Sequence, residues 1–311
     1  MASPSSTSMF PDPEIVNEIA AELAISSAFV EKDWYSVQAL KSIAGHQSDG
    51  FRTLFAGGTS LSKGYGLIQR FSEDLDFRCL ALQSGTGNQM KKVRRAYREG
   101  MLDAVESADL FVLDRSQVAR ASNYVKFELD YPQNYGGNPA LRTGLQIEFS
   151  FTQPRLDAQL RQIQSFVAQF AGEAPEAEIL CLSPVETAAD KLSALTWRVL
   201  KRDRSAAGDD PAMVRHLHDI AALMPVVRDA QGMFIETVEA SFEEDQRTKR
   251  RDTQATLLAS VQAAITCLEG DDEYLDEYGR FVDAMSYASD TESIEFNTAL
   301  IALEEVSSWF E

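Results

Sequence analysis

Two aspartates, two residues apart, constrain this chain more than any other feature. From Asp74 to Leu80 polar residues alternate with apolar ones, which is the pattern of a half-buried strand. Asp74 and Asp76 are therefore expected to face the same side of that strand. Two carboxylates this close repel each other unless a cation lies between them. Such hard oxygen ligands suit Mg²⁺ (or Mn²⁺), which binds one or two carboxylates together with the phosphates of a substrate.

A glycine turn precedes these aspartates. The segment Arg52–Ala56 predicts a short buried strand that ends at two glycines, and Thr59 or Ser60 is placed to cap the helix that follows. Glycines allow a close backbone approach, and a helix N-terminus offers N–H donors to a phosphate. We therefore expect a nucleoside triphosphate (NTP) and a metal to be held side by side. The residues expected to contact the nucleotide here are Gly57, Gly58, Thr59, Ser60 and Lys63.

A third carboxylate is a candidate for the same metal site. The segments Tyr124–Tyr131 and Leu145–Phe151 also alternate with period two. Glu148 is the one acid on the polar face of the second segment, and this strand is expected to neighbour the one with Asp74 and Asp76. A carboxylate there would complete a two-metal site, although the pattern fits a surface glutamate equally well.

The chain is long enough, at 311 residues, to form one large domain or two lobes. Beyond Pro154 the pattern becomes mostly helical, as in Pro184–Leu200 and Met213–Leu223, and no segment alternates convincingly. We expect an α+β protein with a small mixed sheet. The predicted domains are residues 1–154, which include N-terminal helices, and residues 155–311, which are mainly helical.

Several features favour a cytoplasmic protein. No apolar run is long enough to span a bilayer, so no membrane partner is expected. The N-terminal sequence MASPSSTSMFPDPE lacks the basic and apolar segments of a secretory signal. Three scattered cysteines, Cys79, Cys181 and Cys267, are typical of reduced thiols.

The net charge of −19 is concentrated near the C-terminus, because residues 230–311 hold 19 Asp and Glu against 5 Lys and Arg. The acidity therefore does not exclude a nucleic-acid substrate elsewhere. Basic residues cluster at 91–98 and at 201–204, where they could meet phosphates or form solvated helix faces. His216 and His218 precede Asp219, but two histidines at this spacing on a helix point in different directions, so we expect no metal there.

Short motifs follow one another along residues 30–222. They are Glu31-Lys32-Asp33 before an aromatic residue, Gly57–Lys63, Arg70–Phe77, Ala189-Asp190-Lys191-Leu192 and Arg215–Ile220. In this order they resemble the motifs of the AbiEii/AbiGii family of nucleotidyltransferase toxins, which includes the MenT-like toxins. The resemblance implies a polymerase-β-like nucleotidyltransferase lobe followed by a mostly α-helical lobe.

The resemblance assigns roles that the residues alone do not. Lys191 would otherwise be a solvated lysine on an amphipathic helix, and Asp219 a surface acid. The family motifs imply that Lys191 contacts the triphosphate and that Asp219 is an active-site residue, giving a catalytic set of Asp74, Asp76, Lys191 and Asp219. The family also implies a type IV toxin–antitoxin system with a cognate antitoxin, a tRNA 3′ end as the acceptor, and a part in phage defence.

Two departures and two alternatives accompany this interpretation. The interval from Gly58 to Asp74 is longer than in compact nucleotidyltransferases, and the acidic segment after residue 230 matches no motif. The same scaffold could modify protein, with Ser60, Ser62 or Ser72 as an acceptor near the triphosphate. It could also be a non-catalytic binding module that uses the acidic segment as its interface.

Overall fold

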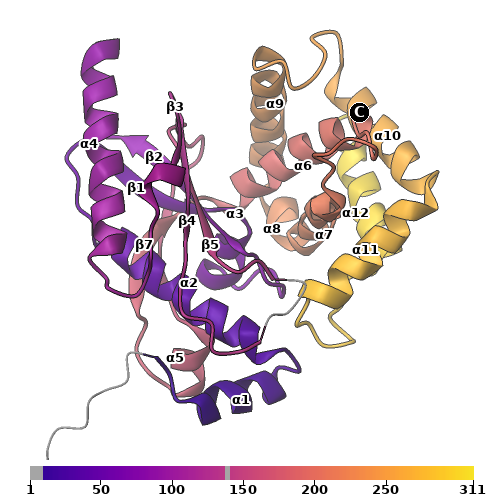
Figure 1. The fold of residues 1–311 in the computed structure, drawn as a ribbon. Coiled ribbons are helices and arrows are strands. Elements are labelled where there is room, and N and C mark those ends of the chain that lie inside the picture. The colour runs from indigo at the N-terminus through magenta and orange to yellow at the C-terminus, as the bar shows by residue number, and fades with distance from the viewer. Residues whose placement is uncertain (1–9, 137–140) are drawn as a thin grey trace, which may run out of the picture. The chain divides into compact units, whose positions relative to one another are not determined.

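The computed structural model of the chain describes residues 10–136 and 141–311, and its contacts divide the chain into two compact units (Figure 1). The first unit contains residues up to Phe55, Glu73–Gln153 and Leu160–Cys181; the second contains Ala56–Ser72, Pro154–Gln159 and Leu182–Glu311. Each unit thus collects segments that are far apart in the sequence. The two are described separately below.

A seven-stranded mixed sheet lies in the described part of the first unit, with strand order β3-β4-β5-β2-β1-β7-β6 (Figure 1). The strands are β1 (Phe51–Ala56), β2 (Asp74–Ala81), β3 (Ala119–Ala121), β4 (Tyr124–Leu129), β5 (Leu145–Ser150), β6 (Gln159–Ile163) and β7 (Ala177–Cys181). Strand β2 runs parallel to β5 and β1 parallel to β7, whereas β4 is antiparallel to both β3 and β5. The expected α+β class with a mixed sheet is confirmed.

One face of this sheet is apolar and buried. The ring of Phe77 on β2 stacks on Phe149 of β5 at 4.9 Å between centroids, and Phe127 of β4 stacks on the same ring at 6.1 Å. Helices α2 (Ser27–Gly45) and α4 (Gly87–Glu106) pack together, and Tyr97 of α4 contacts Phe149. The alternate side chains of β2 and β5 are partly exposed. The alternation of apolar and polar residues in the sequence therefore reflects a sheet with one buried face and one partly exposed face.

The remaining elements of the first unit are α1 (Pro13–Glu22), η2 (Arg115–Gln117) and α5 (Phe166–Phe170). Side-chain caps define the starts of its helices: Asp12 caps α1 and Ser26 caps α2. Thr86 and Gln89 form a reciprocal capping box at the start of α4. These caps satisfy backbone N–H groups that the first turn of a helix leaves without partners.

Helices form most of the second unit. They are α3 (Gly57–Thr59), η1 (Ser60–Gly64), α6 (Pro184–Leu200), η3 (Pro211–Val214), α7 (Arg215–Ala222), α8 (Met224–Asp229), α9 (Gln231–Arg247), α10 (Leu257–Glu269), α11 (Asp272–Met285) and α12 (Phe296–Ser308). Helix α6 begins with proline at its first turn, as expected, and buries Leu192 and Leu195 against Leu217 of α7 in the helical core. Its predicted bounds are those observed.

The region after residue 154 is less uniformly helical than expected. Strands β6 and β7 lie there and complete one end of the sheet, so the expectation of no alternating strand in this region is wrong. Both strands have five residues, and on β6 Leu160 is 57 % exposed. Short strands with an exposed apolar residue give a weak period-two signal. The proposed domain boundary at residue 154 stays a prediction.

The apolar segment Leu110–Leu113 predicts a short strand, but none of the strands among the described residues lies there. The structure has only an isolated bridge between Val112 and Asp130 there.

Within the described residues, no helix combines the length and the apolar character needed to cross a membrane. The N-terminal sequence considered for a secretory signal includes residues 1–9, which lie outside the described residues. Residues 132–144 are rich in Gly, Asn and Pro and predict a loop; of these, residues 137–140 also lie outside the described residues.

Candidate active site

Strands β2 and β5 bring three carboxylates together in the first unit. Asp76 pairs with Glu148 across the two parallel strands, and Asp74 pairs with Gln146 one repeat earlier. The prediction that the Glu148 strand neighbours the aspartate strand is confirmed. The side chains of Asp74 and Glu148 are 30 % and 26 % exposed, so this polar edge of the sheet remains accessible within its unit.

Cations and amides hold two of these carboxylates. Arg142 donates to Asp74 Oδ1 at 3.0 Å. Glu148 Oε1 lies 3.1 Å from Lys126 Nζ and accepts a hydrogen bond from Gln146 Nε2 at 2.8 Å. The two cations are half-exposed, and ion pairs of this kind contribute little to stability. A metal cation could therefore replace Arg142 and Lys126 beside these carboxylates with little loss of stability.

The nearby phenol of Tyr124 is linked to the same carboxylate. Burial raises the pKa of Tyr124, and its hydrogen bond to Glu148 raises it further. The phenol therefore stays protonated and can act as a donor. Glu148 thus has polar partners on the neighbouring strand β4 and on its own strand β5.

The Glu31-Lys32-Asp33 motif acts as a brace in the first unit. Lys32 is 4 % exposed, and its ammonium donates to Glu73 Oε1 at 2.7 Å and to the carbonyl of Arg142 at 2.9 Å. Glu73 also accepts the backbone N–H of Arg142. Because Glu73 directly precedes Asp74, Lys32 fixes the start of β2 and the loop that contacts it. This role had no signal in the sequence beyond the motif itself.

The two acids of the motif have separate partners. Glu31 accepts hydrogen bonds from the backbone and side-chain nitrogens of Asn134, both at 2.8 Å. Asp33 accepts the N–H of Phe166 at 2.7 Å, where α5 begins. Both carboxylates are buried, and buried charges need such partners. All three motif residues therefore anchor segments of the first unit to α2.

The glycine turn folds differently from expectation. The helix begins at Gly57, directly after β1, and continues as a π-helical turn over Ser60–Gly64. Thr59 and Ser60 both have helical backbone angles, with φ near −66° and −65°, so the prediction that one of them caps the helix is wrong. Gly57 has φ of 70°, a left-handed conformation that glycine adopts without strain. It lets the chain turn sharply out of the strand.

Close packing explains the second glycine. A Cβ at Gly58 would meet Ser72 Oγ at 2.9 Å and Arg70 Nη2 at 3.0 Å. Ser60 is 2 % exposed, and its hydroxyl finds no hydrogen-bond partner among the residues that the structure describes. Lys63 lies in the last turn of the π-helical segment. The turn is thus tightly packed, and the buried hydroxyl of Ser60 can still form a hydrogen bond.

Asp219, Arg70 and Lys191 form a buried ionic cluster in the second unit. Arg70 donates through Nε and Nη2 to the two oxygens of Asp219, at 2.7 and 2.5 Å. Lys191 Nζ lies 2.6 Å from Asp219 Oδ2. The side chains of Asp219 and Arg70 are 0 % and 3 % exposed. Asp219 is therefore fully committed to two cations.

The pKa values of this cluster follow from burial and charge. Burial alone would raise the pKa of Asp219, but Arg70 and Lys191 outweigh it and hold that pKa well below its ordinary value. Burial lowers the pKa of Lys191, Asp219 partly offsets this, and Arg70 adds to it. Arg70 was not selected as a site residue from the sequence, although it opens the motif that contains the aspartates. The feature of the sequence that could have identified Arg70 was its place at the start of this motif.

The two histidines of this region are His216 and His218, and the second contacts one acid and two aromatic rings. His218 Nδ1 lies 3.4 Å from Asp219 Oδ1, and its ring contacts Tyr278 and Phe281. Throughout the described residues, no group of three or more His, Cys, Asp or Glu side chains is arranged to hold a metal ion. None of the three cysteines forms a disulfide among the described residues.

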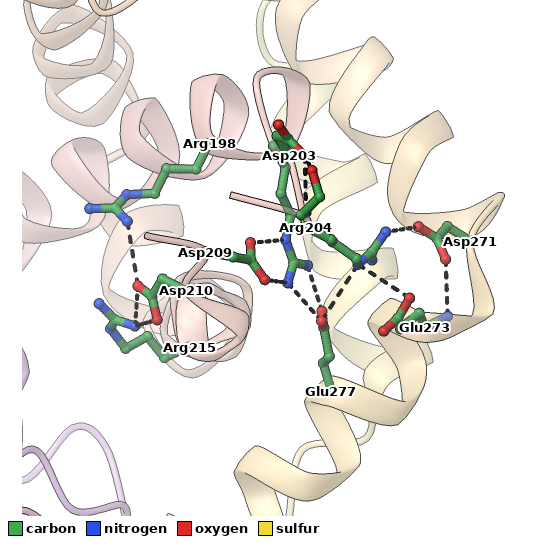
Figure 2. Close-up of polar contacts among 11 residues, drawn as sticks. Arg198, Asp203, Arg204, Asp209, Asp210, Arg215, Asp271, Glu273 and Glu277 are labelled. Carbon is green, nitrogen blue, oxygen red and sulfur yellow. Dashed lines mark hydrogen bonds and ion pairs between the residues drawn. The ribbon is translucent and has the colours of Figure 1, made fainter. Parts of the chain in front are cut away.

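The basic cluster at 201–204 is engaged with acidic residues. Arg202 binds Asp209 and Glu277, while Arg204 binds Asp271 at 2.5 Å and lies near Glu273. Figure 2 shows Arg204 directed at the acidic side chains of α11. These contacts join the 201–211 loop to α11. Arg202 and Arg204 therefore stabilise the helical unit, and acidic side chains lie beside both of their charges.

The basic residues of α4 divide into two groups. Arg94 and Arg98 donate to backbone carbonyls of the β3–β4 turn, including that of Ser122, and both lie over the ring of Phe151. The others are solvent-exposed: Lys91, Lys92 and Arg95. Only this second group can supply charge to an external ligand.

The predicted site residues thus fall into two groups, each described within its own unit. Asp74, Asp76 and Glu148 lie together on the sheet. The second unit contains Gly57, Gly58, Thr59, Ser60, Lys63, Lys191 and Asp219. A mixed sheet with two aspartates on the strand after a glycine turn is the arrangement expected of a nucleotidyltransferase. Enzymes of this class use an NTP and a divalent metal.

Comparison with known proteins identifies the family. The chain belongs to the AbiEii family, described as nucleotidyl transferase AbiEii toxins of type IV toxin–antitoxin systems, whose sequence model matches residues 38–302. Among solved structures it is similar to MenT4, a nucleotidyltransferase toxin from Mycobacterium tuberculosis H37Rv, with a TM-score of 0.53 and 17 % identity over 96 % of this chain and 98 % of that one. This likeness supports the fold. No curated protein matches the sequence.

Proposed function

We propose that this toxin transfers a nucleotidyl group from an NTP to a hydroxyl of RNA, with the 3′ end of tRNA as the favoured acceptor. The observation that carries the proposal is the parallel pairing of Asp76 with Glu148, with Asp74 on the same face of β2. Two carboxylates on adjacent positions of one strand face are suited to bind a metal that also contacts phosphate oxygens. The RNA acceptor follows from the family alone.

Two of the carboxylates, those of Asp74 and Asp76, suit a divalent metal by their chemistry, while no set of three acids is arranged to hold one among the described residues. Asp74 and Asp76 supply hard oxygen donors, and substrate phosphates would supply others, as Mg²⁺ prefers; Mn²⁺ suits the same donors. Glu148 is engaged with Lys126 and Gln146, so it would join as a third ligand only by releasing them. A bound metal at this position would neutralise the triphosphate and lower the pKa of the attacking hydroxyl.

Residues of the second unit would bind and orient the nucleotide. The Gly57–Ser60 turn is proposed to receive phosphate oxygens, and the unused hydroxyl of Ser60 supports a ligand contact there. Lys191 would bind the triphosphate and steady the leaving pyrophosphate as a point charge. Asp219 is fully buried, which favours a role in holding Lys191 and Arg70 over direct contact with substrate.

The proposal is tested by incubating the protein with Mg²⁺, total tRNA and each α-labelled NTP in turn. Label is expected on RNA with one or more nucleotides, and the Asp76→Asn variant should give none. Replacing Mg²⁺ with Mn²⁺ tests the metal. Label transfer at the wild-type rate by Asp76→Asn would overturn the assignment of the metal site.

We also propose that the protein acts in the cytoplasm beside a cognate antitoxin and takes part in phage defence. Family membership supports this setting. Induction of the wild type should arrest growth, and Asp76→Asn should not. Normal growth with abundant folded wild-type protein would contradict the toxin role.

Protein modification remains the alternative reaction. Ser60 is buried and Ser62 donates its hydroxyl to the carbonyl of Thr59, so neither is presented as an acceptor in this conformation. Intact-mass measurement after incubation with NTP distinguishes the two reactions. A mass increase on the protein with no label on RNA would favour protein modification; no Mg-dependent NTP binding would favour a binding module.

A further inference from the structure

His216 is a buried imidazole that the proposed chemistry does not use. It lies on α7 three residues before Asp219, and both of its ring nitrogens are buried without a hydrogen-bond partner among the described residues. The His216 residue as a whole is of intermediate exposure, so it lies near the surface of its unit although its ring nitrogens are buried. Buried polar atoms normally have partners. Two unused nitrogens on one ring therefore indicate a partner that binds from outside.

The surroundings of this ring are predominantly cationic. Helix α6 packs against α7 and η3. The charged residues around His216 are Lys191 and Arg198 on α6, Arg215 and Asp219 on α7, and Asp210 just before η3. Figure 2 shows Arg198 and Arg215 both directed at Asp210, and Asp219 is shared by Lys191 and Arg70. Four cations thus share two carboxylates.

The cations are incompletely satisfied. Arg198 Nε is buried and, within the described residues, has no hydrogen-bond partner. Burial lowers the pKa of Arg198, and Arg215 lowers it further. Positive groups held this close repel one another. An added anion would relieve this repulsion and supply acceptors for the unused nitrogens.

The charge state of His216 would change with such an anion. Burial lowers the pKa of His216 well below its ordinary value, and Lys191, Arg215 and Arg198 lower it further, against a small opposing effect of Asp219. The ring is therefore neutral near pH 7, with one donor and one acceptor. A phosphate oxygen only accepts hydrogen bonds, so protonation from solvent would turn the second nitrogen into a donor.

We propose that His216 contacts the phosphates held by Lys191 and takes up one proton from solvent when they bind. The ligand class is a polyphosphate: the triphosphate of the donor nucleotide or the pyrophosphate that leaves. The proposal rests on Lys191 as the triphosphate contact. It adds a residue to that site and makes phosphate binding depend on pH, tighter at about pH 6 than at about pH 8.

The first test is direct observation of the ring. The chain has three histidines, His46, His216 and His218, so their imidazole resonances can be assigned by single His→Gln variants. Addition of pyrophosphate with Mg²⁺ to the full chain should move the His216 resonances from the neutral to the protonated form, while those of His46 stay unchanged. A His216 ring that remains neutral in the pyrophosphate-saturated protein would overturn the proposal.

The second test distinguishes the positive charge of a protonated His216 from the hydrogen bonds that a neutral side chain can also form. His216→Gln keeps a donor and an acceptor but cannot be protonated, so its pyrophosphate affinity should fall about tenfold or more at about pH 6 and lose its pH dependence. Sulfate is a second probe because its own charge is constant over this range. His46→Gln is the matched control and should bind as the wild type does. Equal pH dependence in His216→Gln and wild type would contradict the proposal.

These outcomes are distinct from failure of the proposed function. Label transfer to RNA that requires Asp76 but is accompanied by a neutral His216 would leave the nucleotidyltransferase intact and remove only this contact. Proton uptake at His216 without any label transfer would retain the anion site and remove the proposed reaction. Thermal unfolding of each variant checks that the fold is retained.

Discussion

Arg70 and Asp219, 149 positions apart in the sequence, form a two-pronged ion pair in which both guanidinium bonds are buried. Lys191 approaches the same carboxylate at 2.6 Å. The segment that leads to Asp74 and Asp76, the motif lysine and the motif aspartate of α7 therefore contribute residues to one polar cluster. Three motifs that look separate along the chain depend on a single buried carboxylate.

Loss of that carboxylate should destabilise the protein strongly. Asp219→Asn leaves Arg70 and Lys191 buried without a counter-charge, and breaking a buried pair in this way costs about 3–5 kcal/mol. Urea unfolding measures the change in the free energy of unfolding. Asp229→Asn, at the exposed end of α8, is the control and should change it by less than about 0.5 kcal/mol. Similar stabilities for the two variants would contradict the central role of Asp219.

The geometry of the arginine should matter as well as its charge. Arg70→Lys keeps the positive charge but cannot donate to both oxygens of Asp219 at once. We expect a loss of about 1–3 kcal/mol in the free energy of unfolding, measured in the same way. Arg280→Lys, on α11, serves as the comparison. Wild-type stability in Arg70→Lys would show that a point charge is sufficient.

Asp76, the proposed metal ligand, should be required for transfer but not for folding. Asp76→Asn removes one hard ligand from an accessible strand face, so label transfer should fall on the order of 10³-fold or more. Its melting temperature should change little. Glu128→Gln, an exposed carboxylate on β4, should keep wild-type activity. The rate of label transfer is measured in a steady-state assay over a range of Mg²⁺ concentrations. Comparable losses of activity in Asp76→Asn and Glu128→Gln would mean that removing any negative charge from this part of the sheet lowers activity.

Acid should destabilise the protein through His216. Because burial and nearby cations lower its pKa in the folded state, the unfolded chain binds more protons once the pH falls below about 6.5. Stability is therefore present above that pH and decreases as the pH falls toward the folded-state pKa, by up to about 1.4 kcal/mol per pH unit. Urea unfolding between about pH 7 and about pH 5 should show a shallower dependence for His216→Gln than for wild type. An unchanged slope would argue against a buried neutral ring.

The brace in the first unit should show direct coupling between its charges. Lys32→Met leaves Glu73 without its closest cation at 2.7 Å and should cost about 3–5 kcal/mol. A double-mutant cycle with Glu73→Gln should give a coupling energy of about 0.5–3 kcal/mol. Lys41→Met, exposed on the same helix, is the control. Additive effects of the two substitutions would mean that the pair is not coupled.

Much of the fold could be predicted because its patterns are local. Alternation predicted β2 and β5 and put Glu148 on the polar face of its strand, since side chains of a strand alternate between two faces; the register that pairs Asp76 with Glu148 came from the structure. The proline at its start and a regular apolar stripe defined α6. The strands β6 and β7 were missed because five residues carry too little periodicity.

The sequence by itself determined the elements whose period or terminal residues are local: the aspartate strand, its neighbour, and the long helices. Only the tertiary structure decided the partners of the buried charges. Lys32 was paired with Glu73 and Arg70 with Asp219 by folding that brings distant segments together. It also left the nitrogens of His216 unused. The physical reason is that burial removes water, so each charge must find a partner wherever the chain places one.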